Sequence, residues 1–184
     1  MKLRNLAIIT GALALATWLA GCATPVELVV KPTDLLMAPR PDNPYNHAIG
    51  LGEMGDTTST SAFNDAFVGK GTVSLALTDS LKSVGYLAPD GRTPPYVVDA
   101  VITENVMDIP VLSTKATSTV TVRYTLKESS SGAEMYNKAV RKEYTAGWDD
   151  TWSGPNRPIK AKHNAVRLTV QQFLDDITSA IYGK

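Results

Sequence analysis

The chain of 184 residues carries 18 basic and 18 acidic side chains, so its formal net charge is zero. This balance excludes the strongly basic surface with which nucleic-acid-binding proteins contact phosphates, and we expect no nucleic-acid partner. A single cysteine and two histidines exclude an internal disulfide and a cysteine-based structural zinc site.

The first 21 residues have the three parts of a secretory signal peptide. Lys2 and Arg4 form a basic start, residues 6–20 are apolar or small apart from two threonines, and small residues precede Cys22. The apolar run is about 15 residues long, whereas a bilayer-spanning helix needs ~20. We therefore predict a signal peptide at 1–21, and the alternative is an uncleaved membrane anchor.

The only cysteine, Cys22, directly follows Leu19-Ala20-Gly21. This run resembles the lipobox of bacterial lipoproteins, in which the cysteine thiol receives a diacylglycerol and the chain is cut before it. The new amino terminus is then acylated. The resemblance implies a lipid on Cys22, with fatty acids such as palmitate. The other interpretation is a buried cysteine that packs as a small hydrophobe, but it does not explain the position at the end of a signal peptide.

The residue after the cysteine is Ala23. In enteric-type sorting, an aspartate at this position retains a lipoprotein in the inner membrane. The resemblance therefore implies an outer-membrane protein that is held by its lipid and faces the periplasm by default. Three acyl chains exceed the two membrane signals that stable anchoring requires.

Proline and glycine dominate the segment from residue 22 to residue 60. Such a composition buries little apolar surface and favours extended chain. We predict a lipidated cysteine followed by a tether over 22–60, in which "VELVV" (26–30) has the composition of an edge strand. A single domain then occupies 61–184.

The first helix is predicted over 61–84. Its apolar side chains recur four residues apart, as in Phe63 and Phe67 or Leu77 and Leu81. Two glycines interrupt this pattern, so its continuous part is 72–84. Gly85 then supplies the left-handed conformation that commonly ends a helix.

Three segments have the composition or alternation of strands: 95–110, 118–129 and 135–148. In the second of them, one face is predicted to be apolar and the other wet, as in a half-buried antiparallel strand. Its apolar face consists of Val120, Val122, Tyr124 and Leu126. The turn "SSSGAE" (129–134) joins the second and third strands into a hairpin.

A final helix is predicted to start near Pro158. Its apolar side chains recur at helical spacing on one face: Val166, Val170, Phe173, Ile177 and Ile181. Together the elements predict an α+β fold, with an antiparallel sheet of three to four strands and two helices packed on one face.

Two stretches carry a resemblance that extends over the domain: "LTDSLKSVGYL" (77–87) and "KHNAVRLTVQQFLDDI" (162–177). With the lipobox, the proline-rich lead and the order of elements, they resemble YajG-type and related envelope lipoproteins. That family offers no established catalytic residues to transfer. The resemblance therefore implies a fold and a location.

Catalytic patterns are lacking in the sequence. His47 lies in the predicted tether and His163 near the start of the last helix, and neither has a partner of its own type nearby. Asp149, Asp150 and Ser153 form a triad with a histidine only on paper, because adjacent loop side chains diverge. We predict no enzyme activity, no cofactor and no metal.

One loop, "AGWDDTWSGPNRP" (146–158), has a composition that indicates more than folding. Its candidate contact residues are Trp148, Asp149, Asp150, Trp152 and Arg157. In one interpretation both indoles cap the edge of the core, and Trp148 is the better candidate for this role. A protein-contact loop is another, because tryptophan and arginine are enriched in interface hot spots. Aromatic and acidic side chains together also suit a sugar.

These features predict a non-enzymatic outer-membrane lipoprotein, an accessory or binding module of a cell-envelope complex. Its partners are the membrane, through the lipid on Cys22, and an envelope protein whose identity the sequence does not give. The alternatives are a secretion- or transport-associated lipoprotein that pairs through a sheet edge, and an enzyme acting on cell-wall or lipid-linked substrates.

Overall fold

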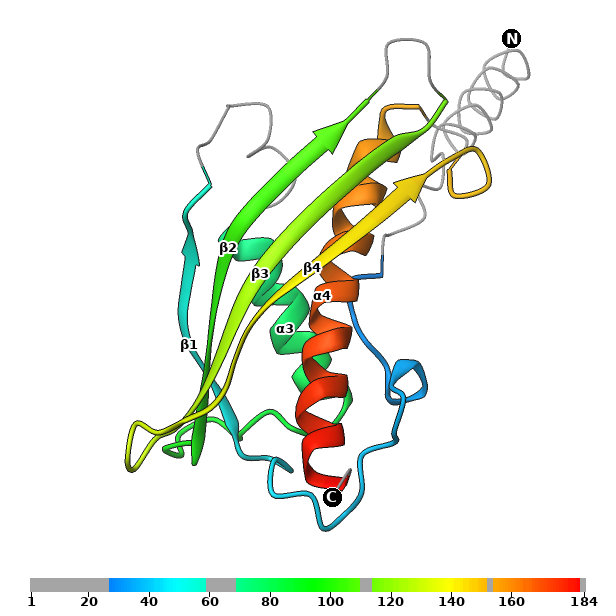
Figure 1. Ribbon diagram of the computed structural model, residues 1–184. Coiled ribbons are helices and arrows are strands. Elements are labelled where there is room, and N and C mark those ends of the chain that lie inside the picture. Colours follow the sequence, from blue (N-terminus) through cyan, green and yellow to red (C-terminus); the bar gives the residue numbers. More distant parts are fainter. Residues whose placement is uncertain (1–26, 59–68, 110–113, 152–153, 183–184) are drawn as a thin grey trace, which may run out of the picture.

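The computed structural model describes residues 27–58, 69–109, 114–151 and 154–182. The predicted signal peptide, Cys22 and the first part of the predicted first helix lie outside these residues. The described elements are, in chain order, η1 (Pro32–Asp34), β1 (Ile49–Asp56), α3 (Lys70–Ser83), β2 (Tyr96–Asp108), β3 (Ala116–Glu128), β4 (Glu134–Ala146) and α4 (Asn156–Tyr182), as Figure 1 shows.

The four strands form one sheet in the order β1-β2-β3-β4. Strand β3 runs antiparallel to both of its neighbours, β2 and β4, whereas β1 runs parallel to β2. The α+β class is therefore confirmed, but the sheet is mixed rather than antiparallel throughout. The reason is the helix α3 between β1 and β2, because such a crossover returns the chain to the same end of the sheet.

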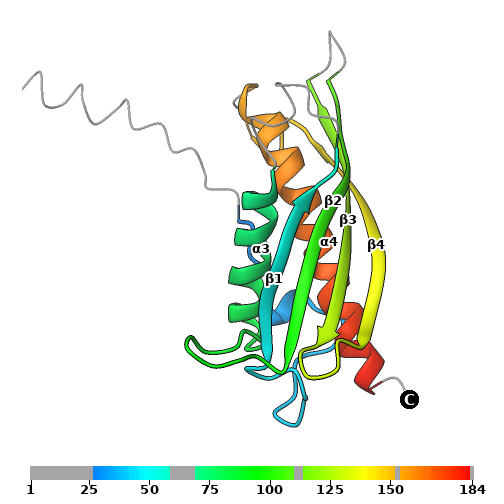
Figure 2. The same cartoon turned by 90° about the vertical axis from the view of Figure 1, so that its left-hand side faces the viewer.

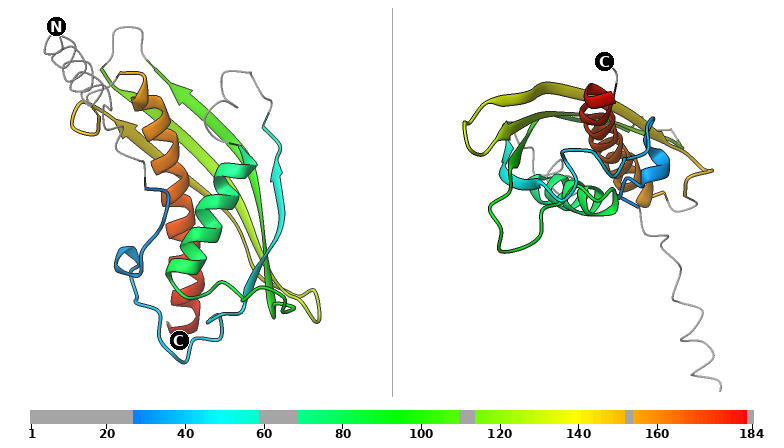
Figure 3. Two further views of the ribbon diagram at one scale, coloured as in Figure 1. Left: turned by 180° about the vertical axis from the view of Figure 1, so that it is seen from behind. Right: turned by 90° about the horizontal axis from the view of Figure 1, so that it is seen from below.

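Helices α3 and α4 lie side by side on one face of the sheet, as predicted (Figures 2 and 3). Figure 3 shows the other face without a covering helix. The molecule thus has two main layers, and we call its two sides the helical side and the open sheet face.

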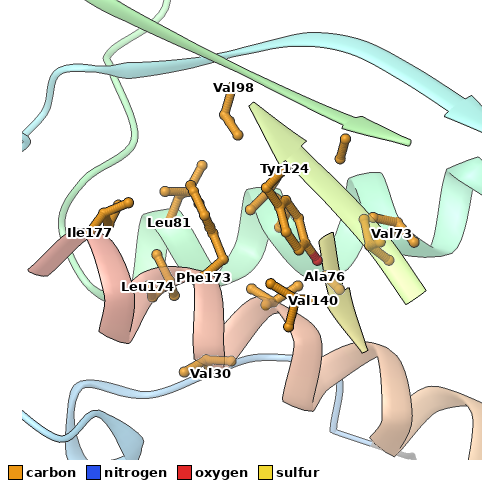
Figure 4. Packing of buried hydrophobic residues seen from close by; sticks show 14 of the residues in the cluster. Val30, Val73, Ala76, Leu81, Val98, Tyr124, Val140, Phe173, Leu174 and Ile177 are labelled. Atoms are coloured by element: carbon orange, nitrogen blue, oxygen red, sulfur yellow. The ribbon is translucent and has the colours of Figure 1, made fainter. Parts of the chain in front are cut away.

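The core lies between α4 and the central strands. Phe173 of α4 stacks on Tyr124 of β3 with ring centroids 4.8 Å apart (Figure 4). Tyr136 of β4 meets the same phenyl ring edge-on at 5.4 Å. The apolar face predicted for the last helix is buried, with Ile181 partly so. The predicted apolar face of β3 is fully buried as well.

The residues that precede β1 are part of the domain and correct the predicted tether. Residues 27–36, which we call the N-terminal strap, pack on the helices. Val30 is fully buried, and its N–H donates to Ser80 Oγ of α3 at 2.9 Å. The predicted strand at 26–30 is not formed over the described residues 27–30, because these backbone groups bond to helix side chains instead of a sheet.

Strand β1 lies in the other part of the predicted tether, and its glycines explain why the sequence pattern conceals it. A Cβ on Gly52 would lie only 2.2 Å from Asp99 Oδ1 and 2.6 Å from a methyl group of Val97. The Asp99 carboxylate fills that space and accepts the Glu53 N–H at 2.8 Å. Glycine here indicates close packing against β2 rather than a flexible chain.

Removal of residues 1–59 is expected to abolish cooperative unfolding, because the variant that begins at Thr60 lacks β1 and the strap. Val30 and Ile49 are both fully buried, and the loss of such side chains costs about 2–5 kcal/mol each, against a total stability of about 5–15 kcal/mol. A variant that begins at Glu27 is the control and should melt in one transition. Thermal and urea unfolding followed by circular dichroism tests this, and a cooperative melt of the shorter variant would contradict it.

Candidate functional site

The loop between β4 and α4 lies at the end of the molecule where α4 begins and where β1 and β2 end (Figure 1). Strand β4 ends at the buried Ala146, and Gly147 leads into a turn at 148–150. Helix α4 begins six residues later, at Asn156. The loop therefore connects two rigid elements that are packed on each other.

Asp150 holds this loop together. Its carboxylate accepts the hydroxyl of Tyr144 at 2.5 Å and the N–H of Gly147 at 3.0 Å. The ammonium group of Lys160, in the first turns of α4, lies 3.8 Å from the same carboxylate and also donates to the backbone carbonyl of Asp150. One side chain thus joins the end of the strand, the turn and the start of the helix.

The pKa values in this cluster reflect these contacts. Burial raises the pKa of the Asp150 carboxyl. Hydrogen bonds from Tyr144 and Gly147 and the charge of Lys160 lower this pKa by more than burial raises it, so the pKa lies below its ordinary value. The bond to Asp150, with burial and the carboxylate charge, raises the pKa of Tyr144 to about 12. At neutral pH, Asp150 is therefore an ionised acceptor and Tyr144 a neutral donor.

Trp148 does not cap the core, because its side chain is 50% exposed. Its indole instead covers Arg157, whose guanidinium carbon lies 4.0 Å from the ring centroid. Arg157 is only 8% exposed, and its Nε–H donates to the carbonyl of Thr151 at 3.3 Å. The predicted contact arginine is therefore a support beneath the loop, and the indole is the surface that it supports.

The remaining predicted contact residues divide into two groups. The side chain of Asp149 is exposed beside Trp148. Trp152 lies outside the described residues, as does Ser153. Of the described candidate contact residues, Trp148 and Asp149 are thus exposed, whereas Asp150 and Arg157 lie deeper and hold the loop.

The structure does not bring the two histidines together. His47 is exposed and lies in the turn that leads into β1, where its φ of 52° is left-handed. His163 lies in the first third of α4, and the starts of β1 and α4 are at opposite ends of the molecule (Figure 1). Over the described ranges, no group of three or more metal-ligating side chains is found.

A buried polar region beneath this end of the molecule is not apparent in the sequence pattern. Lys162 of α4 is 1% exposed, and Asn105 of β2 and Ser118 of β3 are also buried. The buried apolar residues described here are the alanines Ala116, Ala146 and Ala161, with Met107 and Tyr144 partly buried against them. Ser118 occupies the same alternating positions as Val120 and Val122, and this inward register is the signal that could have revealed it.

Comparison with solved structures identifies the fold in several bacterial proteins. A protein from Caulobacter crescentus CB15, described as a candidate lipoprotein, is 12% identical, with 76% of this chain and 93% of that chain covered at a TM-score of 0.53. A protein from Xanthomonas campestris is 12% identical, covers 79% and 94%, and has a TM-score of 0.50. PelC from Paraburkholderia phytofirmans, crystallised as a dodecamer, is 13% identical, covers 72% and 88%, and has a TM-score of 0.50.

At these identities the likeness shows a shared fold, and the first of these proteins carries the description of a lipoprotein. No protein-family model matches the sequence, and no curated protein matches it either. The resemblance to YajG-type proteins stays a prediction. In the part of the chain that the structure describes, no helix has both the length and the apolar character to cross a bilayer.

Replacement of Asp150 by asparagine is expected to destabilise the domain by about 1–3 kcal/mol at pH 7, because three charge-assisted contacts are weakened. A depressed carboxyl pKa stabilises the folded state above about pH 4, and this contribution is lost as the pH falls further. The difference between wild type and Asp150→Asn should therefore shrink between pH 6 and pH 3. Urea unfolding measures it.

The matched control for this prediction is Asp149→Asn. Asp149 is the exposed neighbour in the same turn, so its change should stay within about 0.5 kcal/mol at both pH values. Equal effects of the two replacements, or a difference for Asp150→Asn that does not depend on pH, would contradict the role assigned to the carboxylate.

Proposed function

We propose that this protein is a lipid-anchored envelope protein of the bacterial outer membrane that acts as a non-enzymatic binding module. The observation that carries the proposal is the single cysteine at the end of Leu19-Ala20-Gly21-Cys22, directly after an apolar leader. The protein shares its fold with a bacterial protein described as a candidate lipoprotein, which supports the proposal.

The loop between β4 and α4 is the proposed contact site for an envelope protein. Its exposed indole, Trp148, is held over a buried guanidinium, so little side-chain freedom is lost when a partner covers it. Trp152 lies four residues further on and adds a second aromatic side chain to the same loop. A rigid, half-exposed tryptophan is the usual anchor of a protein interface.

The alternative role, in a secretion or transport system, uses a sheet edge. Strand β1 is an edge strand that carries three glycines and two acidic residues, and β4 at the other edge carries three basic and two acidic residues. Edges of opposite net charge favour pairing between strands of different chains. PelC, which shares the fold, is a dodecamer in its crystals, so this fold is compatible with large assemblies.

Catalysis on cell-wall or lipid-linked substrates has less support. A nucleophile, a base and an orienting group must lie within hydrogen-bond reach of each other. His47 and His163 belong to opposite ends of the molecule, and Asp150 already serves as the acceptor for Tyr144, Gly147 and Lys160. A binding role is therefore the better proposal.

Replacement of Cys22 by serine is expected to abolish lipid attachment, because a hydroxyl is too weak a nucleophile for the transfer of diacylglycerol. The variant should stay at the mass of the precursor and incorporate no labelled palmitate, while the wild type is processed and labelled. The control is Ala23→Ser, which makes a similar change one residue later and should be processed normally. Labelled palmitate on Cys22→Ser would exclude the assignment of the lipid to this cysteine.

A photo-crosslinking amino acid in place of Trp148 is expected to capture an envelope protein in intact cells. The control position is Met135, which is similarly exposed but lies at the opposite end of β4. Mass spectrometry identifies the captured protein. A crosslink from position 135 and none from position 148 would argue against the loop as the contact site.

A further inference from the structure

The N-terminal strap begins on the helical side of the molecule, away from the open sheet face. Figure 4 shows Val30 and Val98, a residue of β2, on opposite sides of α4, and Figure 3 shows the first described residues beside the helices. The chain therefore enters the folded domain over the two helices.

Several bonds fasten the strap to this side. Arg167 of α4 donates to the carbonyl of Val29 at 3.2 Å and forms an ion pair with Asp34 at 2.5 Å. The Leu36 N–H donates to the carboxylate of Asp175 at 2.7 Å. These contacts come from both ends of the strap, so its start is held in place on the helical side.

Only four residues, 23–26, separate Cys22 from the first described residue, Glu27. A fully extended chain of this length reaches at most about 17 Å from the cysteine. With its acyl chains in the bilayer, a lipidated Cys22 would lie at the level of the lipid headgroups. The point at which the strap joins the helices must then lie within this short distance of the lipid headgroups.

The thickness of the molecule decides which side the short linker, residues 23–26, can bring to the membrane. A helix with its side chains is about 10–12 Å across, and the sheet with its outward side chains adds about 10 Å. A path around the domain from the start of the strap to the open sheet face is therefore longer than about 20 Å. This distance exceeds the reach of the linker.

The helical side also has exposed apolar side chains that can contact the membrane. The most exposed large apolar side chains at the strap and on α3 are Leu36, 79% exposed, and Leu75, 54% exposed. Ion pairs occur on both sides, between Lys127 and Asp99 and between Arg141 and Glu104 on the open sheet face and between Lys31 and Glu27 on the strap, so charge pairing does not distinguish the sides. In a membrane-bound protein, apolar side chains that face the bilayer are buried at the boundary between headgroups and acyl chains.

We propose that the helical side of this protein rests against the lipid surface of the membrane and that the open sheet face is turned towards the aqueous compartment. The proposal rests on the lipid at Cys22 proposed above. The membrane contact consists of the strap and the outer surface of α3, with Leu36 and Leu75 nearest to the headgroups. The open sheet face stays accessible to soluble partners.

The test uses the purified, lipidated full-length protein in vesicles of phosphatidylethanolamine and phosphatidylglycerol with a headgroup nitroxide. A fluorophore is attached to Leu75→Cys or, as the matched control, to Ala139→Cys, an exposed position on the open sheet face. Acylation blocks the thiol of Cys22, so each variant has one reactive cysteine. The label at position 75 should be quenched several-fold more strongly than the label at position 139.

A second variant tests whether the length of the linker determines the orientation. A flexible insertion of about 20 glycine and serine residues between positions 26 and 27 lengthens the reach several-fold and should make the quenching at the two positions similar. Equal quenching without the insertion, or stronger quenching at position 139, would overturn the proposal. Mass spectrometry of Cys22 separates the two proposals: absence of the lipid refutes both, whereas a lipidated protein with the wrong quenching pattern refutes only the orientation.

Discussion

The contact of α4 with β3 and β4 is the interaction on which the rest of the structure depends. Phe173 lies between Tyr124 and Tyr136, so one helical side chain joins two strands. The long helix also supplies the polar partners of the strap, on its side away from the sheet. Without α4, the central strands and the strap would lose the surface on which they pack. A β-hairpin alone is only marginally stable in water.

The elements predicted correctly are those in which one residue pattern repeats. Alternation in β3 and helical spacing in α4 follow directly from burial on one face, so the sequence displays them. The strap and β1 have no such repeat. Val30 is buried against the helices and its N–H donates to Ser80. At Gly52, the side chain of Asp99 occupies the space that a Cβ would need. Proline and glycine in this part of the chain therefore conceal structure that arises from contacts distant in sequence.

The loop shows the same division between composition and geometry. Its unusual content of tryptophan and aspartate is visible in the sequence, but the roles of the individual side chains depend on their depth. The two neighbouring aspartates differ, because the carboxylate of Asp150 accepts two hydrogen bonds and pairs with Lys160, whereas Asp149 is exposed. Arginine and tryptophan also exchange the expected positions, with Arg157 below and Trp148 above. Sequence patterns identify a loop of this kind, and only the structure assigns its surface.

The bonds between the strap and α4 also bear on the order of events during folding. Asp34 and Arg167 are 133 positions apart, and Leu36 and Asp175 are 139 apart, so the first described residues wait for the last helix before they can dock. Contacts of such long range form late, because a large loop must close first. Residues 27–36 can therefore dock only after α4 has packed on the sheet. Docking of the strap is then a late step in the folding of the domain, and it completes the packing around Val30.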